Sequence, residues 1–201
     1  MIKKIVLTAI VLVSFLQVNA QAAIPENIVK ESIVKHSMEM GVDPALALSI
    51  AKKESGFKHE LKSPYGAVGV FQVLPSTAKK IGYNPYYLNE NIKAGLTYYK
   101  MMYNMFGSTE LALAAYNAGP GNVKKYGGAI PPFRETKRFV NVIMHDYKQL
   151  KLNPDPVIAK YNRETSIATE TELNNSPKPI ELPDLNEIPE HREADSTMEI
   201  L

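Results

Sequence analysis

One stretch of sequence decides the fold: DPALALSIAKKESG, residues 43–56. Aspartate followed by proline is a strong helix start, because the acid caps the first turn and proline fits the first helical position. The residues from Ala45 to Ala51 are apolar nearly all round, which is typical of a helix inside a domain. Gly56 is predicted to end this helix, since glycine readily adopts the left-handed conformation found at helix C-termini. The stretch therefore predicts a buried helix with Glu54 in its last turn.

Glu54 lies on the apolar face of this helix, together with Ile50 and Ala51. Burial separates a carboxylate from water and raises its pKa, and the partial negative charge of a helix C-terminus acts in the same direction. A carboxyl group of this kind keeps its proton near neutral pH and is suited to donate it to a glycosidic oxygen. Helix geometry alone leaves an alternative open, in which Glu54 turns outward to water beside Lys53.

Other helices are predicted where apolar residues at helical spacing are bounded by glycine, proline or capping residues. They fall near residues 28–40, 75–81, 89–106, 108–116 and 135–150, with one further turn after residue 121. Residues 59–73 are rich in glycine and turn formers and are predicted to form an irregular loop or a short hairpin. The fold class is therefore mainly α, with one helical domain over residues 23–152.

The N-terminus has the pattern of an export signal. Lys3 and Lys4 precede an apolar run over residues 5–16, and small residues follow it. The run is shorter than the roughly 20 residues that a membrane-spanning helix needs. Residues 1–22 are therefore interpreted as a cleavable signal peptide, with an uncleaved anchor as the alternative. We expect a periplasmic or secreted protein.

Charge is unevenly distributed along the chain. The formal net charge is +2, but 17 basic and 10 acidic groups lie between residues 21 and 152, against 4 basic and 11 acidic in 153–201. A basic domain suits an anionic polymer. Export makes the cell wall the expected polymer, and we expect no nucleic acid partner.

The sequence also argues against a metal centre. Cysteine is absent, so disulfides and thiolate metal sites are excluded. The four histidines, His36, His59, His145 and His191, are dispersed without the spacing of metal ligands. We expect neither a metal nor another cofactor.

Residues 153–201 differ in character from the preceding domain. Six prolines are scattered among acidic and polar residues, and no helical period is apparent. This composition predicts a disordered acidic tail. Between Pro177 and Pro189, isoleucine and leucine alternate with acids. Such a segment is either a docking site that folds on binding or a simple tether.

Two further motifs offer groups to a polar ligand. GAVGVFQ, residues 66–72, has two glycines where the backbone can approach a ligand closely, and it ends on the amide of Gln72. AYNAGPG, residues 115–121, is a predicted helix end that presents Tyr116 and Asn117 together. Taken singly, the first motif is also compatible with an ordinary turn and the second with a core tyrosine.

The order of the motifs resembles one known family. It runs from Glu54-Ser55 through 66-GAVGVFQ-72, 91-NIKAG-95 and 115-AYNAG-119 to Glu135-Thr136. This series closely resembles the soluble lytic transglycosylases, over about residues 24–150. Two positions depart from the common pattern, because Phe71 stands where methionine is frequent and Phe139 where tyrosine is frequent.

The resemblance implies a lysozyme-like helical domain with a long saccharide groove, which binds peptidoglycan glycan strands. The bond cleaved would be the β-1,4 linkage between N-acetylmuramic acid and N-acetylglucosamine, with closure of a 1,6-anhydro ring. Glu54 would act first as acid and then as base, without a second carboxylate. Tyr116 would lie beside Glu54, Ser63, Gln72 and Asn117 would bind or orient sugar, and Glu135 would position the substrate.

Compact exported members of this family often open the wall locally for a secretion, conjugation or pilus apparatus, to which the acidic tail would dock. We expect the protein to be a monomer. Two alternatives remain. A goose-type lysozyme would hydrolyse the same bond with water, with Glu135 as the motif acid available to activate it. A non-catalytic wall-binding scaffold would keep the fold and lose the chemistry.

Overall fold

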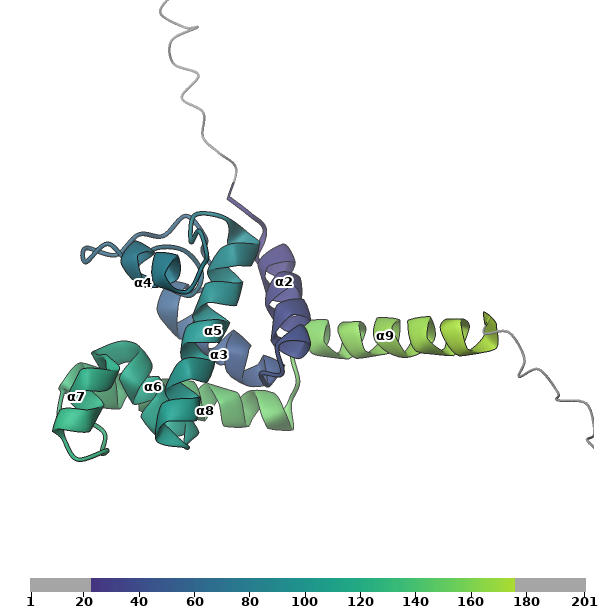
Figure 1. Cartoon of the computed structure of the whole chain (residues 1–201). Helices are drawn as coiled ribbons and strands as arrows, with labels where there is room; N and C mark the ends of the chain where they lie inside the picture. Colours follow the sequence, from purple (N-terminus) through teal and green to yellow (C-terminus); the bar gives the residue numbers. More distant parts are fainter. Residues whose placement is uncertain (1–22, 176–201) are drawn as a thin grey trace, which may run out of the picture. The chain divides into compact units, whose positions relative to one another are not determined.

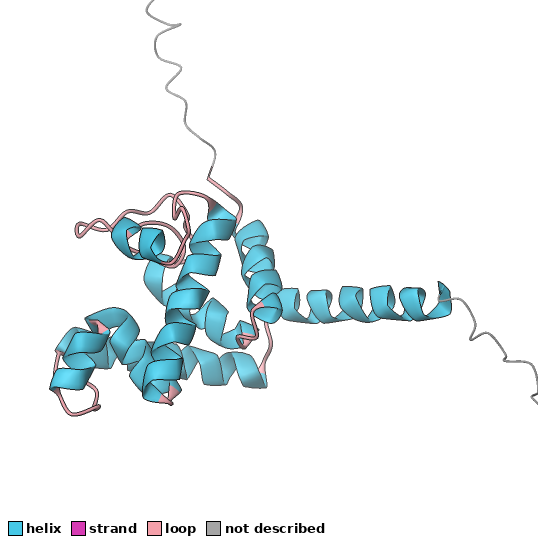
Figure 2. Cartoon of the chain, in the orientation of Figure 1, coloured by secondary structure: helices cyan, strands magenta, loops and turns pink. Residues whose placement is uncertain are grey.

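The computed structural model describes residues 23–175. The predicted signal peptide and the segment Pro177–Pro189 lie outside the described residues. The chain divides into a compact unit that ends at Thr165 and a second unit that begins at Ser166. The described residues form helices and contain no strand (Figures 1 and 2). The helices are α2 (Glu26–Glu39), α3 (Pro44–Ser55), α4 (Pro75–Lys80), α5 (Leu88–Phe106), α6 (Thr109–Ala118), α7 (Pro120–Lys125), α8 (Arg134–Leu152) and α9 (Pro156–Asn175).

Both ends of α3 are capped by the residues that the sequence predicts. The Asp43 side chain accepts a 2.9 Å hydrogen bond from the backbone N–H of Ala45, and Pro44 occupies the first turn. Gly56 ends the helix in the left-handed conformation, with φ of 59°. Every residue from Ala45 to Ala51 is buried. The mainly α fold class is confirmed.

Helix α3 lies in the core because its neighbours cover it on several sides. Helices α2 and α8 pack against it, α5 packs against α2 and α6, and α6 also contacts α7 and α8. The largest fully buried side chains include Phe71, Ile33, Leu48, Ile50, Ile92, Leu96, Met102, Leu113 and Ile143. The last turn of α3 therefore lies at the end of a helix that is packed into the core.

The segment between α3 and α4 is irregular, as predicted. Val68 forms isolated antiparallel bridges to Lys62 and Val73, and these do not extend into a ladder. The backbone N–H of Ser63 donates to the carbonyl of Ala67, and the N–H of Gly66 donates back to Ser63, so the chain reverses tightly here. We call residues 57–74 the α3–α4 loop.

Helix α9 contradicts part of the predicted disordered tail, because residues 156–175 are helical. Asp155 accepts a hydrogen bond from the backbone N–H of Val157, and Pro156 occupies the first helical position. Val157, Ile158 and Tyr161 pack against the core. The prediction of disorder was wrong for residues 156–175, because the apolar contacts that stabilise the start of this helix are made with core residues outside the segment.

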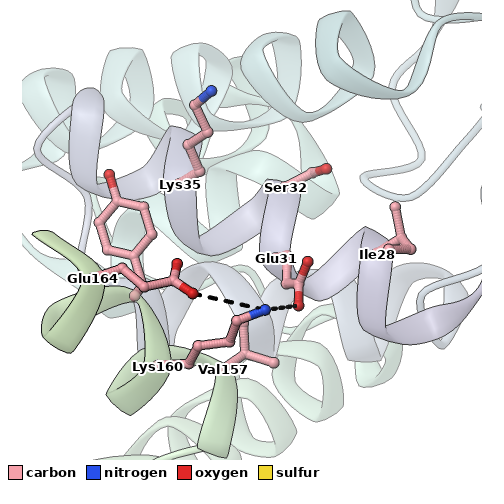
Figure 3. A pocket seen from close by; sticks show the side chains of 8 residues that line it. Ile28, Glu31, Ser32, Lys35, Val157, Lys160 and Glu164 are labelled. Atoms are coloured by element: carbon pink, nitrogen blue, oxygen red, sulfur yellow. Dashed lines mark hydrogen bonds and ion pairs between the residues drawn. The ribbon is translucent and has the colours of Figure 1, made fainter.

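Ion pairs between α2 and the start of α9 accompany this packing. Lys160 Nζ of α9 lies 2.8 Å from Glu31 Oε1 of α2, and it also lies 3.9 Å from Glu164 Oε1 within α9. These three residues border a cavity of about 310 Å³ (Figure 3). Lys30 pairs with Asp155 at 3.2 Å. Exposed pairs of this kind contribute little energy each, so the apolar contacts carry most of the attachment. Within the described residues, no helix is long and apolar enough to cross a bilayer.

Candidate active site

A groove of about 710 Å³ runs across the domain between the α3–α4 loop and the segments around α6 and α8. All six side chains predicted to act on substrate line it: Glu54, Ser63, Gln72, Tyr116, Asn117 and Glu135. They come from α3, the α3–α4 loop, α6 and α8, so the fold brings together residues that are far apart in the sequence. Polar and aromatic side chains both border the groove, which suits a ligand that carries polar groups on an apolar frame.

Glu54 is the penultimate residue of α3 and reaches the groove from the packed core. Burial raises its pKa from the usual 4.5 to about 8. The positive charge of Lys53 lowers this pKa and the negative charge of Glu135 raises it, but burial outweighs both. Glu54 is therefore a carboxylic acid at neutral pH, able to donate a proton to a ligand in the groove.

Tyr116 stands beside Glu54 near the end of α6. Its hydroxyl donates a 2.8 Å hydrogen bond to the backbone carbonyl of Phe71. Burial and the neighbouring Glu54 raise the pKa of Tyr116 well above its usual value, so the phenol keeps its proton. Its ring packs between Tyr98, with centroids 5.2 Å apart, and Phe139, at 6.4 Å and nearly parallel. The hydroxyl is thereby fixed in position at the groove.

Asn91 of α5 holds the α3–α4 loop in place. Its side-chain oxygen accepts from the backbone N–H of Phe71 at 2.9 Å, and its amide group donates to the carbonyls of Val68 and Pro85. The Asn91 side chain is completely buried, so all three bonds are shielded from water. The loop conformation is therefore set by the core and not by the loop alone.

Two glycines permit this close approach. A Cβ atom at Gly69 would overlap the Asn91 amide, and one at Gly95 would overlap the side chain of Phe71. Gly69 also has a positive φ of 78°. From the other side, the Ser55 hydroxyl donates a 2.9 Å hydrogen bond to the carbonyl of Val70. The loop is thus attached to both α3 and α5.

Gln72 follows the anchored segment with an unusual backbone, at φ of 45°. Its amide nitrogen donates to the carbonyls of Leu61 and Gly69. These bonds fix the orientation of the Gln72 side chain where it lines the groove. A strained backbone held by surrounding bonds is a frequent property of binding sites.

Ser63 and Asn117 are likewise oriented by neighbours. The Ser63 hydroxyl accepts a hydrogen bond from the backbone N–H of Ala67 at 3.0 Å. The Asn117 side-chain oxygen accepts a 2.8 Å bond from the hydroxyl of Thr136, which is buried. This bond fixes the orientation of the Asn117 amide at the groove.

Glu135 lies in the first turn of α8 and is exposed to solvent. The groove therefore carries two carboxyl groups with different environments, a desolvated one at Glu54 and a hydrated one at Glu135. A position in the first turn of a helix favours a negative charge. The exposed carboxyl group of Glu135 and the desolvated one of Glu54 thus border the same groove.

Sequence reasoning missed several residues that shape the site. Thr136 and Asn91 stood within the quoted motifs, but their partners are groups distant in the sequence. Tyr65, Tyr98 and Phe133 also line the groove. Tyr98 lies within α5, where a tyrosine at helical spacing is equally compatible with core packing, so the sequence does not indicate that it borders the groove.

Comparison with known proteins agrees with these observations. Residues 31–137 match the family model described as the transglycosylase SLT domain. A soluble lytic murein transglycosylase of Salmonella typhimurium is 35% identical over 130 residues, covering 52% of this chain and 20% of that protein. A transglycosylase of Enterobacteria phage PRD1 is 30% identical over 129 residues, covering 64% of this chain and 46% of that protein.

Solved structures agree with the sequence relatives. The 70 kDa soluble lytic transglycosylase of Escherichia coli matches with a TM-score of 0.53 and 29% identity, covering 63% of this chain and 25% of that one. An inactive mutant of the lytic transglycosylase Slt from Pseudomonas aeruginosa matches with a TM-score of 0.54 and 27% identity, at the same coverage. The chain thus spans about a fifth of the length of the murein transglycosylase it matches in Salmonella.

Proposed function

Because the chain belongs to the family of transglycosylase SLT domains, we propose that it is a peptidoglycan lytic transglycosylase. Its substrate is the glycan strand, cleaved at the β-1,4 bond between N-acetylmuramic acid and N-acetylglucosamine. The groove supports this proposal, because its volume is about 710 Å³ and it is lined by hydrogen-bonding and aromatic side chains, as an oligosaccharide requires. The basic balance of residues 21–152 suits an anionic wall.

One observation carries the proposal: Glu54 lines this groove, and burial raises the pKa of its carboxyl group to about 8. In the first step its proton moves to the glycosidic oxygen as the bond from that oxygen to the muramic acid C1 breaks. Glu54 is left as a carboxylate. The acetamido group of the substrate assists at C1, so no second carboxylate is needed for this step.

In the second step the carboxylate of Glu54 takes the proton from the C6 hydroxyl of the same muramic acid. The C6 oxygen then bonds to C1, where it replaces the assisting acetamido group, and closes the 1,6-anhydro ring. The proton taken from the C6 hydroxyl stays on Glu54, which is thereby returned to its acid form. Glu54 thus acts first as the acid and then as the base, and it ends the reaction in the protonated form in which it began. Tyr116, fixed on the Phe71 carbonyl, keeps the groove wall beside Glu54 in place.

Glu54→Gln tests this assignment because it removes the proton donor and keeps the shape of the side chain. We expect the variant to fold and to leave glycan strands intact. Glu60→Gln is a matched control, since Glu60 is an exposed glutamate of the α3–α4 loop that does not line the groove. Equal cleavage by wild type and Glu54→Gln would refute the role of Glu54 and the enzymatic proposal with it.

The hydrolytic alternative uses Glu135 to activate a water molecule. Glu135 is exposed and lines the same groove as Glu54. Product mass separates the two reactions, because an anhydro end is one water lighter than a hydrolysed end. Hydrolysed ends that disappear in Glu135→Gln would favour the goose-type lysozyme.

We further propose export and a local role in the envelope. Export rests on the signal-like pattern of residues 1–22, and it is tested by N-terminal sequencing of the protein recovered from the periplasm or medium. The apparatus hypothesis rests on the acidic, apolar-interleaved sequence between Pro177 and Pro189. Deleting residues 176–201 should impair assembly of the secretion, conjugation or pilus machine while cleavage continues. Normal assembly would leave this segment a tether.

A further inference from the structure

Two adjacent lysines in the last turn of α3 have different environments. Lys52 is exposed and pairs with Asp146 of α8 at 2.9 Å. The ammonium group of Lys53 instead lies over the ring of Phe139, 5.4 Å from its centroid. Within residues 23–175, no carboxylate lies within ion-pair distance of Lys53, so its charge is not neutralised by a direct partner.

Phe139 connects Lys53 to the site. Its ring is buried and lies nearly parallel to Tyr116, at an interplanar angle of 10°. Tyr116 in turn stands beside Glu54. A cation over an aromatic face is attracted by the ring and loses part of the freedom of a surface lysine. The Lys53 charge is therefore held at the back of the groove wall, one residue before Glu54.

We propose that Lys53 is a positioning residue for the cleavage reaction, whose ammonium group, seated on Phe139, stabilises the carboxylate form of Glu54. This inference rests on the proposed function for its consequence in catalysis. Proton donation leaves Glu54 negatively charged in a desolvated place, and a fixed positive charge nearby lowers the energy of that state. The same charge is present when the carboxylate takes the proton of the C6 hydroxyl.

The other groups that face Glu54 do not supply this charge. Glu135 of α8 repels the anion, and burial disfavours it. Tyr116 of α6 is neutral, as is Tyr98 of α5 behind it. Lys53 thus opposes the effects that keep Glu54 protonated. Without the Lys53 charge, Glu54 would be a weaker acid and would donate its proton less readily near neutral pH.

Direct titration of Glu54 tests this without reference to activity. The side-chain carboxyl signal of Glu54 is followed by carbon NMR and assigned by its absence in Glu54→Gln. Lys53→Met removes the charge and keeps an apolar chain for the Phe139 ring. We expect its Glu54 midpoint to move to higher pH by about half a unit, because one positive charge is lost whose effect is reduced by water around the ammonium group.

Matched variants separate the charge from packing. Lys52→Met, one residue earlier, should leave the Glu54 midpoint unchanged, and Lys53→Arg should keep it within error of wild type. A Lys53→Met midpoint that coincides with wild type, or a Lys52→Met shift of equal size, would overturn the inference. These results stand whether or not the protein cleaves glycan.

The catalytic consequence is measured separately. In the Lys53→Met variant the high-pH limb of the cleavage rate should move upward with the Glu54 midpoint, and the maximal rate should fall about two-fold because the acid is weaker. A purely structural loss would lower the rate without moving the limb. Absence of cleavage in the wild type would reject the proposed function, while the NMR titration would still decide the role of Lys53.

Discussion

The hydroxyl of Tyr116 and the backbone carbonyl of Phe71 are joined by a 2.8 Å hydrogen bond, although the two residues are 45 positions apart in the sequence. This bond ties the end of α6 to the α3–α4 loop directly beside Glu54. It satisfies a loop carbonyl in the core and fixes the phenol at the groove. One interaction therefore serves both the stability of the loop and the geometry of the acid.

Tyr116→Phe removes this bond and keeps the ring. We expect the free energy of unfolding to fall by about 1–2 kcal/mol, because the Phe71 carbonyl is left without its partner. Cleavage should fall by roughly ten-fold, since the loop is no longer tied to α6 beside Glu54. Urea denaturation and initial rates measure the two effects. Tyr86→Phe, at an exposed tyrosine outside the groove, is the control and should match wild type.

Gly95→Ala places a methyl group against Phe71, where no space exists. Overpacking of this kind costs about 1–3 kcal/mol of stability. We expect a lower melting temperature and a lower cleavage rate, because Phe71 carries both the Asn91 and Tyr116 contacts.

Gly121→Ala is the control for this substitution. Its added methyl group would meet open space within α7. The variant should be as stable as wild type or slightly more stable, by up to about 1 kcal/mol. Equal effects of the two alanines would show that the Gly95–Phe71 contact is not tight.

Thr136→Val removes the hydroxyl that orients Asn117 and keeps the volume of the side chain. The Asn117 amide can then rotate, so substrate binding should weaken. We expect KM for a glycan fragment to rise several-fold with a smaller change in kcat. Thr97→Val, on α5 outside the groove, provides the matched comparison. A fall in kcat alone would point to a role for Thr136 in the chemical step.

The pKa of Glu54 also makes stability depend on pH. The folded protein keeps a proton on Glu54 up to about pH 8, whereas the unfolded chain releases it near 4.5. Folding therefore takes up a proton between these values, and the stability from the protonated form is lost as pH rises through this window. Glu54→Gln should be more stable than wild type by on the order of 1–3 kcal/mol at pH 8, with little difference at pH 4.

Chemical denaturation of the two proteins at several pH values measures this difference. The gap should widen from pH 4.5 to pH 8 and then level off. A gap that stays constant across the range would mean that Glu54 titrates normally and faces water.

Much of the fold followed from local signals. Asp43 with Pro44 at the start of α3 and Gly56 at its end define a helix by backbone chemistry that a sequence displays directly. The groove residues followed from an ordered series of motifs. These motifs meet in space only in the fold that the resemblance implied. The structure places all six predicted site residues around one groove.

The parts that sequence could not supply depend on contacts with backbone or with distant apolar residues. Asn91 bonds to two backbone carbonyls and a backbone N–H, groups that do not distinguish one residue type from another in a sequence. The position of Lys53 over Phe139 depends on how α3 and α8 pack. Helix α9 was missed because its apolar residues are few and gain stability only against the core.

The central claim is that Glu54 cleaves glycan without water, and digestion of peptidoglycan in heavy-oxygen water tests it most directly. Mass spectrometry of the wild-type digest should show 1,6-anhydro ends that carry no label, and Glu54→Gln should produce none of them. Labelled, hydrolysed ends in the wild-type digest, or unlabelled anhydro ends persisting in Glu54→Gln, would contradict the account.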